Sequence, residues 1–403
     1  MKLLSRIAGS RSDGIRALLT TVGLYLGLGA IFLAGCIWAP GFLTVPNQRD
    51  VLRSTADKGL ISLGMTFVIL TAGIDLSVGR LVGLTSTVAA MLLMERSWNL
   101  ASQIAVPAMA AVGMFFVGRL VWSLAGLAGA PRGVRLVPSV LAGLAAAMGL
   151  AVWGASQVPR GFGVAGVLVA APMVGMLLGA FNGAVIAKGR LQPFIVTLAM
   201  MVSAYGLAKY IAGKGGQVHA VYFAPDQATP TFELLRHQIV IAGQKVIPVP
   251  ALFFLGAALI AHVLLSSQRF GRQAYAVGGN EESARLSGIN VDAVKVAVYA
   301  ISGALAGVSG VLFCAQYQQG WPDAGSAWEL DAIAAVVIGG TSLMGGRGGI
   351  SGTFVGVLIF QYLKNILDLR GFRPETQLLL TGIIILLAVL LQEVRFGRWR
   401  RGS

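Results

Sequence analysis

Long apolar runs recur along the whole chain, separated by short polar breaks, and they constrain its fold more than any other feature. Several runs approach the roughly 20 residues that a helix needs to cross a bilayer. We therefore predict an all-α integral membrane protein, a polytopic bundle of about 10–12 transmembrane helices that forms a single domain over residues 1–403. The approximate runs are 18–39, 59–74, 80–95, 102–127, 136–154, 164–187, 191–212, 248–266, 293–315, 329–345, 350–367 and 376–392.

Composition and charge exclude other classes of protein. Charged residues make up 12% of the chain, about half the roughly 25% usual for a soluble domain, which argues against a soluble enzyme. The net charge of +15 is not accompanied by interleaved aromatic and basic residues, so we predict no nucleic-acid partner. Basic residues instead flank the apolar runs, which indicates cytoplasmic termini by the positive-inside rule. The terminal residues concerned are Arg6, Arg11, Arg16, Arg395, Arg398, Arg400 and Arg401.

Two of the apolar runs are short and interrupted by glycine and polar residues. Run 59–74 ends next to Asp75, and run 329–345 contains two adjacent glycines followed by Thr341 and Ser342. Such breaks occur at membrane depth only where protein or a water-filled pathway covers the backbone. The pattern favours discontinuous or re-entrant helices, and an ordinary helix end is the alternative.

The polar stretch 267–292 contains signals for a short capped helix. Asn280 suits the N-cap position and is followed by two glutamates, which the helix dipole favours. Gly288 suits a left-handed C-terminal position, so we expect a helix over 281–287, and Asn290 can cap a second helix immediately afterwards. We interpret this rigid turn as a cytoplasmic docking element, with a plain solvated loop as the alternative. The residues assigned to it are Gly278, Gly279, Asn280, Glu281, Glu282, Arg285, Leu286, Ser287 and Gly288.

Residues that hold metals or perform catalysis are not grouped in this sequence. Cys36 and Cys314 lie in apolar runs without a neighbouring cysteine or histidine, and the three histidines are scattered. No phosphate-binding G-x-x-x-x-G-K-[ST] motif occurs. We therefore predict no metal site, no catalytic residue and no ATP bound by this chain.

Three blocks of the sequence carry a resemblance to a known family. Residues 63–79 are similar to a GMTxVILTxGIDLSVG pattern, residues 275–289 to YAxGGNxxAARLSGI, and residues 329–348 to ELDAIAAVVxGGTSLxGGxG. With these blocks the chain resembles the permease subunit of bacterial ATP-binding cassette (ABC) importers for monosaccharides, the branch with ribose, xylose, arabinose and galactose permeases. The resemblance covers about 45–95 and 160–395, and leaves 96–160 as an additional pair of helices of unknown role.

The resemblance implies a type II importer fold and a division of labour between subunits. The permease translocates a ribose-type pentose, a hexose or a related polyol across the bacterial inner membrane. ATP and Mg²⁺ are then bound by a separate ATPase, a periplasmic sugar-binding protein delivers the substrate, and two permease copies form the pore in the lipid bilayer. Twelve apolar runs and an intramembrane acid also allow an ion-coupled secondary sugar transporter, which stays open as the alternative.

Candidate residues of the sugar pathway lie near the two broken runs. A carboxylate inside the membrane is costly and usually functional, so Asp75 either accepts hydrogen bonds from sugar hydroxyls or caps the helix that follows it. Glu329 and Asp331 can equally cap a helix, lie at the membrane interface or line the sugar pathway. The full candidate set is Thr71, Asp75, Ser77, Asn182, Gln192, Glu329, Asp331, Thr341 and Ser342.

Overall fold

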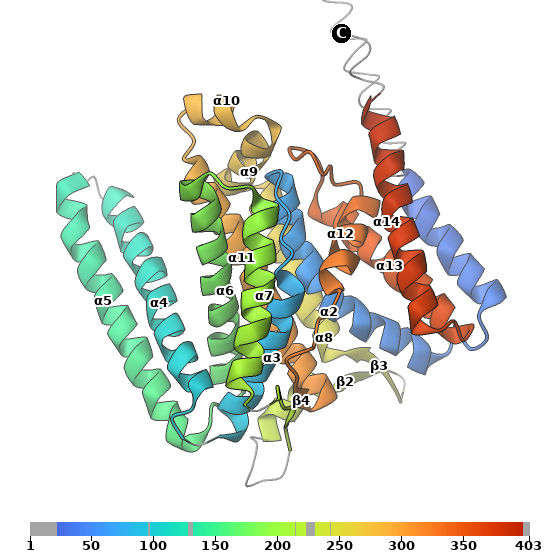
Figure 1. Cartoon of the computed structure of the whole chain (residues 1–403), viewed down its shortest axis with the longest axis horizontal. Coiled ribbons are helices and arrows are strands. Elements are labelled where there is room, and N and C mark those ends of the chain that lie inside the picture. The colour runs from blue at the N-terminus through green and yellow to red at the C-terminus, as the bar shows by residue number, and fades with distance from the viewer. Residues whose placement is uncertain are drawn as a thin grey trace, which may run out of the picture.

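The computed structural model describes residues 22–95, 97–127, 132–213, 215–222, 230–241 and 243–397, and it is built mainly of long helices packed side by side (Figure 1). Within the described residues, every apolar run predicted from the sequence overlaps a helix. The N-terminal helix of this part is Val22–Trp38. The other long helices are α2 Val45–Leu70, α3 Val78–Met94, α4 Leu100–Leu127, α5 Arg132–Gln157, α6 Val164–Gly189, α7 Pro193–Ile211, α8 Val249–Ser266, α11 Val291–Tyr317, α13 Ile350–Leu369 and α14 Pro374–Gly397.

Seven helices in the described part are long and apolar enough to cross a membrane, which confirms a polytopic helical protein. They lie at Leu100–Trp122, Leu136–Arg160, Val164–Gly189, Pro193–Ile211, Val249–Ser266, Val291–Tyr317 and Ile350–Leu369. Helix α2 is equally long, but it carries several charged residues that include Asp57 and Lys58. The total of 10–12 crossings stays a prediction.

Helix α11 lies at the centre of the bundle and packs against α2, α3 and α6. Glycine allows the closest of these approaches, because a Cβ at Gly175 of α6 would overlap the backbone of Gly303 in α11, and the reverse also holds. Gly179 of α6 meets Tyr299 of α11 in the same way. Glycine thus allows close helix packing at the centre of the bundle.

Residues 96–160 supply the helix pair α4 and α5, which pack against each other at one side of the bundle (Figure 1). Of this pair only α4 makes extensive further contacts, mainly with α6. Two helices were expected here. Their status as an addition relative to shorter family members stays a prediction.

The two ends of the bundle differ. At one end lie the short helices α9 (Arg269–Gly279) and α10 (Glu281–Leu286), together with the last turns of α14 (Figure 1). At the opposite end lie η2 (Pro230–Arg236) and the antiparallel hairpin of β2 (Gln238–Ile241) and β3 (Gln244–Pro248), in which Ile239 pairs with Ile247. Near this hairpin, β1 (His219–Ala220) pairs with β4 (Gln319–Gly320). The terminal residues Arg6, Arg11, Arg16, Arg398, Arg400 and Arg401 lie outside the described part.

Candidate coupling and translocation site

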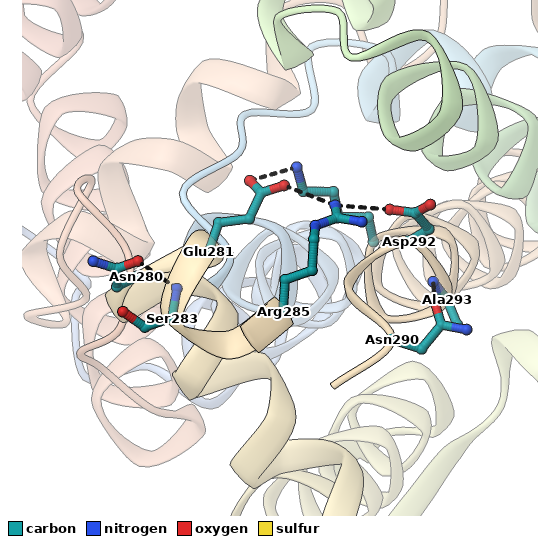
Figure 2. Close-up of polar contacts among 8 residues, drawn as sticks. Asn280, Glu281, Ser283, Arg285, Asn290, Asp292 and Ala293 are labelled. Carbon is teal, nitrogen blue, oxygen red and sulfur yellow. Dashed lines mark hydrogen bonds and ion pairs between the residues drawn. The ribbon is translucent and has the colours of Figure 1, made fainter. Parts of the chain in front are cut away.

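Helix α10 is held by a cap at each end. The Asn280 side-chain oxygen accepts a hydrogen bond from the Ser283 amide at 2.8 Å, and Gly288 adopts a φ of +82° after the helix (Figure 2). The Asn290 side-chain oxygen then accepts from the Ala293 amide at 3.0 Å and starts α11. The capped helix predicted over 281–287 is therefore present, one residue shorter. A helix of six residues does not form without such support.

Ion pairs fasten α10 to the first turns of α11 (Figure 2). Lys295 donates to Glu281 at 2.7 Å, while Arg285 lies 3.1 Å from Asp292 and 3.5 Å from Glu281. Most of these side chains are substantially exposed, so each pair contributes at most about 1 kcal/mol, but together they fix the orientation of α10. Leu286 is 84% exposed, so an apolar side chain lies uncovered at the end of this helix.

The end of α9 meets both broken segments at a contact that we call the glycine junction, formed by Leu70, Gly278, Gly345 and Gly346. The Gly346 amide donates a hydrogen bond to the Leu70 carbonyl oxygen at 2.9 Å. A Cβ at Gly278 would overlap that same oxygen and lie 2.6 Å from the Gly346 nitrogen. A Cβ at Gly345, where φ is +79°, would lie 2.8 Å from the Gly278 oxygen. Only glycine lets these three backbones approach so closely.

A tyrosine gives α9 a second link to the loop between α12 and α13. The Tyr275 hydroxyl donates to the Gly348 carbonyl oxygen at 2.8 Å. Burial raises the pKa of Tyr275, so the hydroxyl stays protonated and keeps this bond at any physiological pH.

The first broken segment is a buried turn built around Asp75. Helix α2 ends at Leu70 and α3 begins at Val78. One Asp75 carboxylate oxygen accepts from the Ser77 amide at 3.0 Å and its hydroxyl at 2.6 Å, and the other accepts from the Ser302 hydroxyl of α11 at 2.9 Å. Asn182 of α6 donates to the Ser77 hydroxyl at 3.2 Å. In this conformation Asp75 organises the turn before α3, and a direct role toward sugar stays a prediction.

The second broken segment contains α12 (Trp328–Ile338), a helix of 11 residues. At 1.5 Å per residue it extends about 16 Å, roughly half of a hydrocarbon core of about 30 Å. Buried Thr341 packs against Gly348, and the Ser342 amide donates to the Arg347 carbonyl oxygen at 2.9 Å. At the first break, Thr71 donates its hydroxyl to Val68 at 2.9 Å. Both breaks therefore have the discontinuous form that the sequence favours.

The acidic residues at the start of α12 are buried inside the protein. Asp331 accepts from Lys364 of α13 at 2.7 Å through both oxygens and lies 3.4 Å from Lys58 of α2. Glu329 is 9% exposed, and its Oε2 has no hydrogen-bond partner. Sequence reasoning missed Lys58 and Lys364 because nothing local pairs them with Asp331.

Gln192 is not brought together with the other candidates. Its side chain is exposed at the N-cap position of α7 and makes no capping hydrogen bond. Thr197, one turn further along α7, instead reaches the first break, where it donates to the Ile74 carbonyl oxygen at 3.1 Å.

Metal-ligating side chains do not gather in the described part of the chain, where no group of three or more histidine, cysteine, aspartate or glutamate residues has metal-binding geometry. Cys36 and Cys314 are separate free thiols.

The sequence matches known transport permeases over most of its length. A family model described as "Branched-chain amino acid transport system / permease component" matches residues 137–389. The chain is also 36% identical over 382 residues to the ribose import permease protein RbsC of Bacillus subtilis, with 94% of each chain covered. The chain belongs to this permease family.

The permease is likewise 35% identical over 355 residues to RbsC of Escherichia coli K12, with 88% of each chain covered. It is 33% identical over 359 residues to the xylose transport system permease protein XylH of the same strain, with 86% of this chain and 85% of XylH covered. No solved structure matches it.

In the permease, the three sequence blocks that carry the family resemblance meet in space. Leu70 lies in the first block, Gly278 in the second, and Gly345 and Gly346 in the third, and these residues form the glycine junction. The distinctive residues of the chain thus gather where α9 touches both broken segments.

Proposed function

We propose that this permease is the membrane-spanning subunit of an ABC importer that carries a monosaccharide, either a ribose-type pentose, a hexose or a related polyol, across the inner membrane. The observation that carries the proposal is the 33–36% identity, over most of the chain, to permeases named for ribose and xylose. The description of the matching family model names branched-chain amino acids. Uptake of such an amino acid is therefore the alternative to sugar uptake.

The energy comes from a partner ATPase that binds ATP and Mg²⁺. The sequence of the permease has no phosphate-binding loop of its own. Residues Gly278 to Gly288 form the docking element for the ATPase, because α10 is doubly capped, projects from the bundle and exposes Leu286. A periplasmic sugar-binding protein delivers the substrate at the opposite end, near the β2–β3 hairpin.

The glycine junction transmits the movement of the ATPase to the membrane. The backbone of Gly278 contacts Leu70 and Gly346 so closely that no atom fits between them. Packed interfaces of this kind switch between discrete arrangements and do not deform continuously. A tilt of α9 and α10 therefore shifts the end of α2 and the loop after α12 together. These are the two places where the helices are already interrupted.

The orientation and assembly follow from the same reasoning. The α10 end faces the cytoplasm, because Arg269, Arg272 and Arg285 concentrate positive charge there, and both termini lie on that side. Two copies of the chain form the translocation unit, since an importer of this kind requires two membrane halves.

Reconstitution in vesicles with the ATPase and binding protein tests the proposal. We expect ATP-driven uptake of radiolabelled ribose and no uptake of leucine. Arg285→Glu reverses a charge on α10 and should abolish uptake and the coupling of ATP hydrolysis, whereas Arg373→Glu, which reverses an 83% exposed charge beyond α13, should leave both unchanged. Uptake of leucine alone would contradict the sugar assignment. Uptake that needs no ATPase and collapses with the proton gradient would favour a secondary transporter.

A further inference from the structure

A group of polar side chains from three separate elements meets within the bundle, and nothing described above uses it. The Tyr205 hydroxyl of α7 donates to Asp323 at 2.6 Å. Lys209 of α7 and Arg80 of α3 lie 3.8 and 4.0 Å from the same Asp323 oxygen. Tyr205 and Lys209 belong to the candidate membrane span Pro193–Ile211. Tyr205 lies six residues before the end of that span, about 9 Å inside it at 1.5 Å per residue.

The aromatic ring and a second carboxylate complete this group, which we call the polar cluster (Arg80, Tyr205, Lys209, Asp323 and Glu329). Two cations lie over the Tyr205 ring, with the Arg80 guanidinium carbon 4.3 Å and the Lys209 ammonium 4.5 Å from its centroid. Glu329 interacts electrostatically with Arg80, and its buried Oε2 still lacks a hydrogen-bond partner. Two positive and two negative charges give the cluster no net charge.

The chain segment that carries Asp323 is irregular and runs along an apolar helix. Within residues 318–327 only the two residues of β4 are regular. A Cβ at Gly320 would lie 2.6 Å from that of Ala90, near one end of α3, and a Cβ at Gly325 would overlap the backbone of Gly79, near the other end. The segment therefore follows α3 for about 16 Å. Irregular backbone does not face lipid at such depth, but lines water or is covered by protein.

Side chains on this segment are nevertheless exposed. Trp321 is 39% exposed, the Asp323 side chain is 36% exposed, and Ser326, which accepts from Arg80 at 3.2 Å, is also exposed. Partly exposed charges inside a membrane domain line a polar pathway. Polar, partly exposed side chains on the face formed by α3, α7 and residues 318–327 are what a water-lined surface requires.

We propose that the polar cluster, together with Trp321, is a weak sugar-hydroxyl site in the outer part of the translocation pathway. This inference rests on the proposed function. A hydroxyl both donates and accepts, and the cluster offers the partly exposed Asp323 carboxylate as an acceptor beside guanidinium and ammonium donors. Its zero net charge suits an uncharged polyhydroxylated ligand, and a half-exposed site allows the sugar to leave, as conduction requires.

Transport by matched variants tests the site. Tyr205→Phe keeps the ring and removes the hydrogen bond to Asp323, and Asp323→Asn removes the charge. At saturating binding protein, each variant should lower ribose uptake about tenfold while the rate of ATP hydrolysis stays near that of the wild type. Tyr210→Phe alters a tyrosine on the same helix that is 74% exposed and should change neither quantity. Loss of uptake and ATP hydrolysis in parallel, or no loss of uptake, would overturn the site.

Thiol labelling tests the water-lined surface independently of transport. In a Cys36→Ser background, Ser326→Cys should react with a bilayer-impermeant maleimide, and ribose-loaded binding protein with ATP should slow the reaction. Leu141→Cys, on a 61% exposed position of α5, should not react because it faces lipid. Failure of Ser326→Cys to react, or labelling that ribose does not slow in a transporting complex, would overturn the inference. Wild-type vesicles without sugar uptake would instead refute the proposed function.

Discussion

The Gly346 amide donates a hydrogen bond to the Leu70 carbonyl oxygen at 2.9 Å, although the two residues belong to different broken segments. This bond ties the end of α2 to the loop between α12 and α13. Gly278 packs against both partners without room for a side chain. We therefore expect the three segments to move together, so that a displacement of α9 would reach both breaks.

The caps of α10 should control its local stability. Asn280→Ala removes the bond to the Ser283 amide, a change that typically costs about 1 kcal/mol. Hydrogen exchange of residues 283–288 should accelerate about fivefold to tenfold, because a helix this short depends on its caps. Gln268→Ala is the matched control, since Gln268 occupies the N-cap of α9 without a capping hydrogen bond. Equal exchange in both variants would show that the Asn280 cap does not stabilise α10.

Replacing Asp75 separates its structural role from a direct role toward sugar. Asp75→Ala leaves buried donors of Ser77 and Ser302 without an acceptor, at a cost of about 1–3 kcal/mol for each unsatisfied group. We expect a clearly lower melting temperature in detergent, with Ser302→Ala, which loses a single bond, showing a smaller decrease. Unchanged melting combined with lost ribose uptake would assign Asp75 to the pathway instead.

The ion cluster of Asp331 should respond asymmetrically to substitution. Asp331→Asn removes the carboxylate that pairs with both Lys58 and Lys364, whose side chains are only 15% and 18% exposed, and removing one partner of a buried ion pair destabilises a protein by up to about 3–5 kcal/mol. Lys364→Met keeps the pair of Asp331 with Lys58 and should destabilise far less. Chemical unfolding in detergent measures both changes, and equal destabilisation would contradict the assigned geometry.

Features with local causes were predictable from the sequence. Asn280 and Asn290 act on amides three residues away, so the boundaries of α10 and the start of α11 follow from a short window. The apolar runs located the long helices for the same reason. The interruptions at residues 71–77 and 339–349 were predictable because glycine and polar residues stand inside apolar sequence.

Features that depend on distant partners were not predictable in this way. Helix α9 contains Gly271, Gly278 and Gly279, which disfavour a helix in isolation. It is stable because Gly271 packs on Leu265 and Gly278 packs on Leu70. Likewise, Asp323 meets Tyr205 across 118 residues, and no local pattern links them. One sequence also does not show which side of a helix faces lipid.

The most direct test of the coupling account compares alanine at two adjacent glycines of α9. Gly278→Ala places a methyl group against the Leu70 oxygen, whereas a Cβ at Gly279 meets nothing within 4 Å. Both variants are reconstituted with the ATPase and binding protein after their melting temperatures show that they are folded. ATP-driven ribose uptake per ATP hydrolysed should fall about tenfold or more in Gly278→Ala, because the added methyl group disrupts the junction, and match the wild type in Gly279→Ala. Equal coupling in the two variants would contradict transmission through the glycine junction.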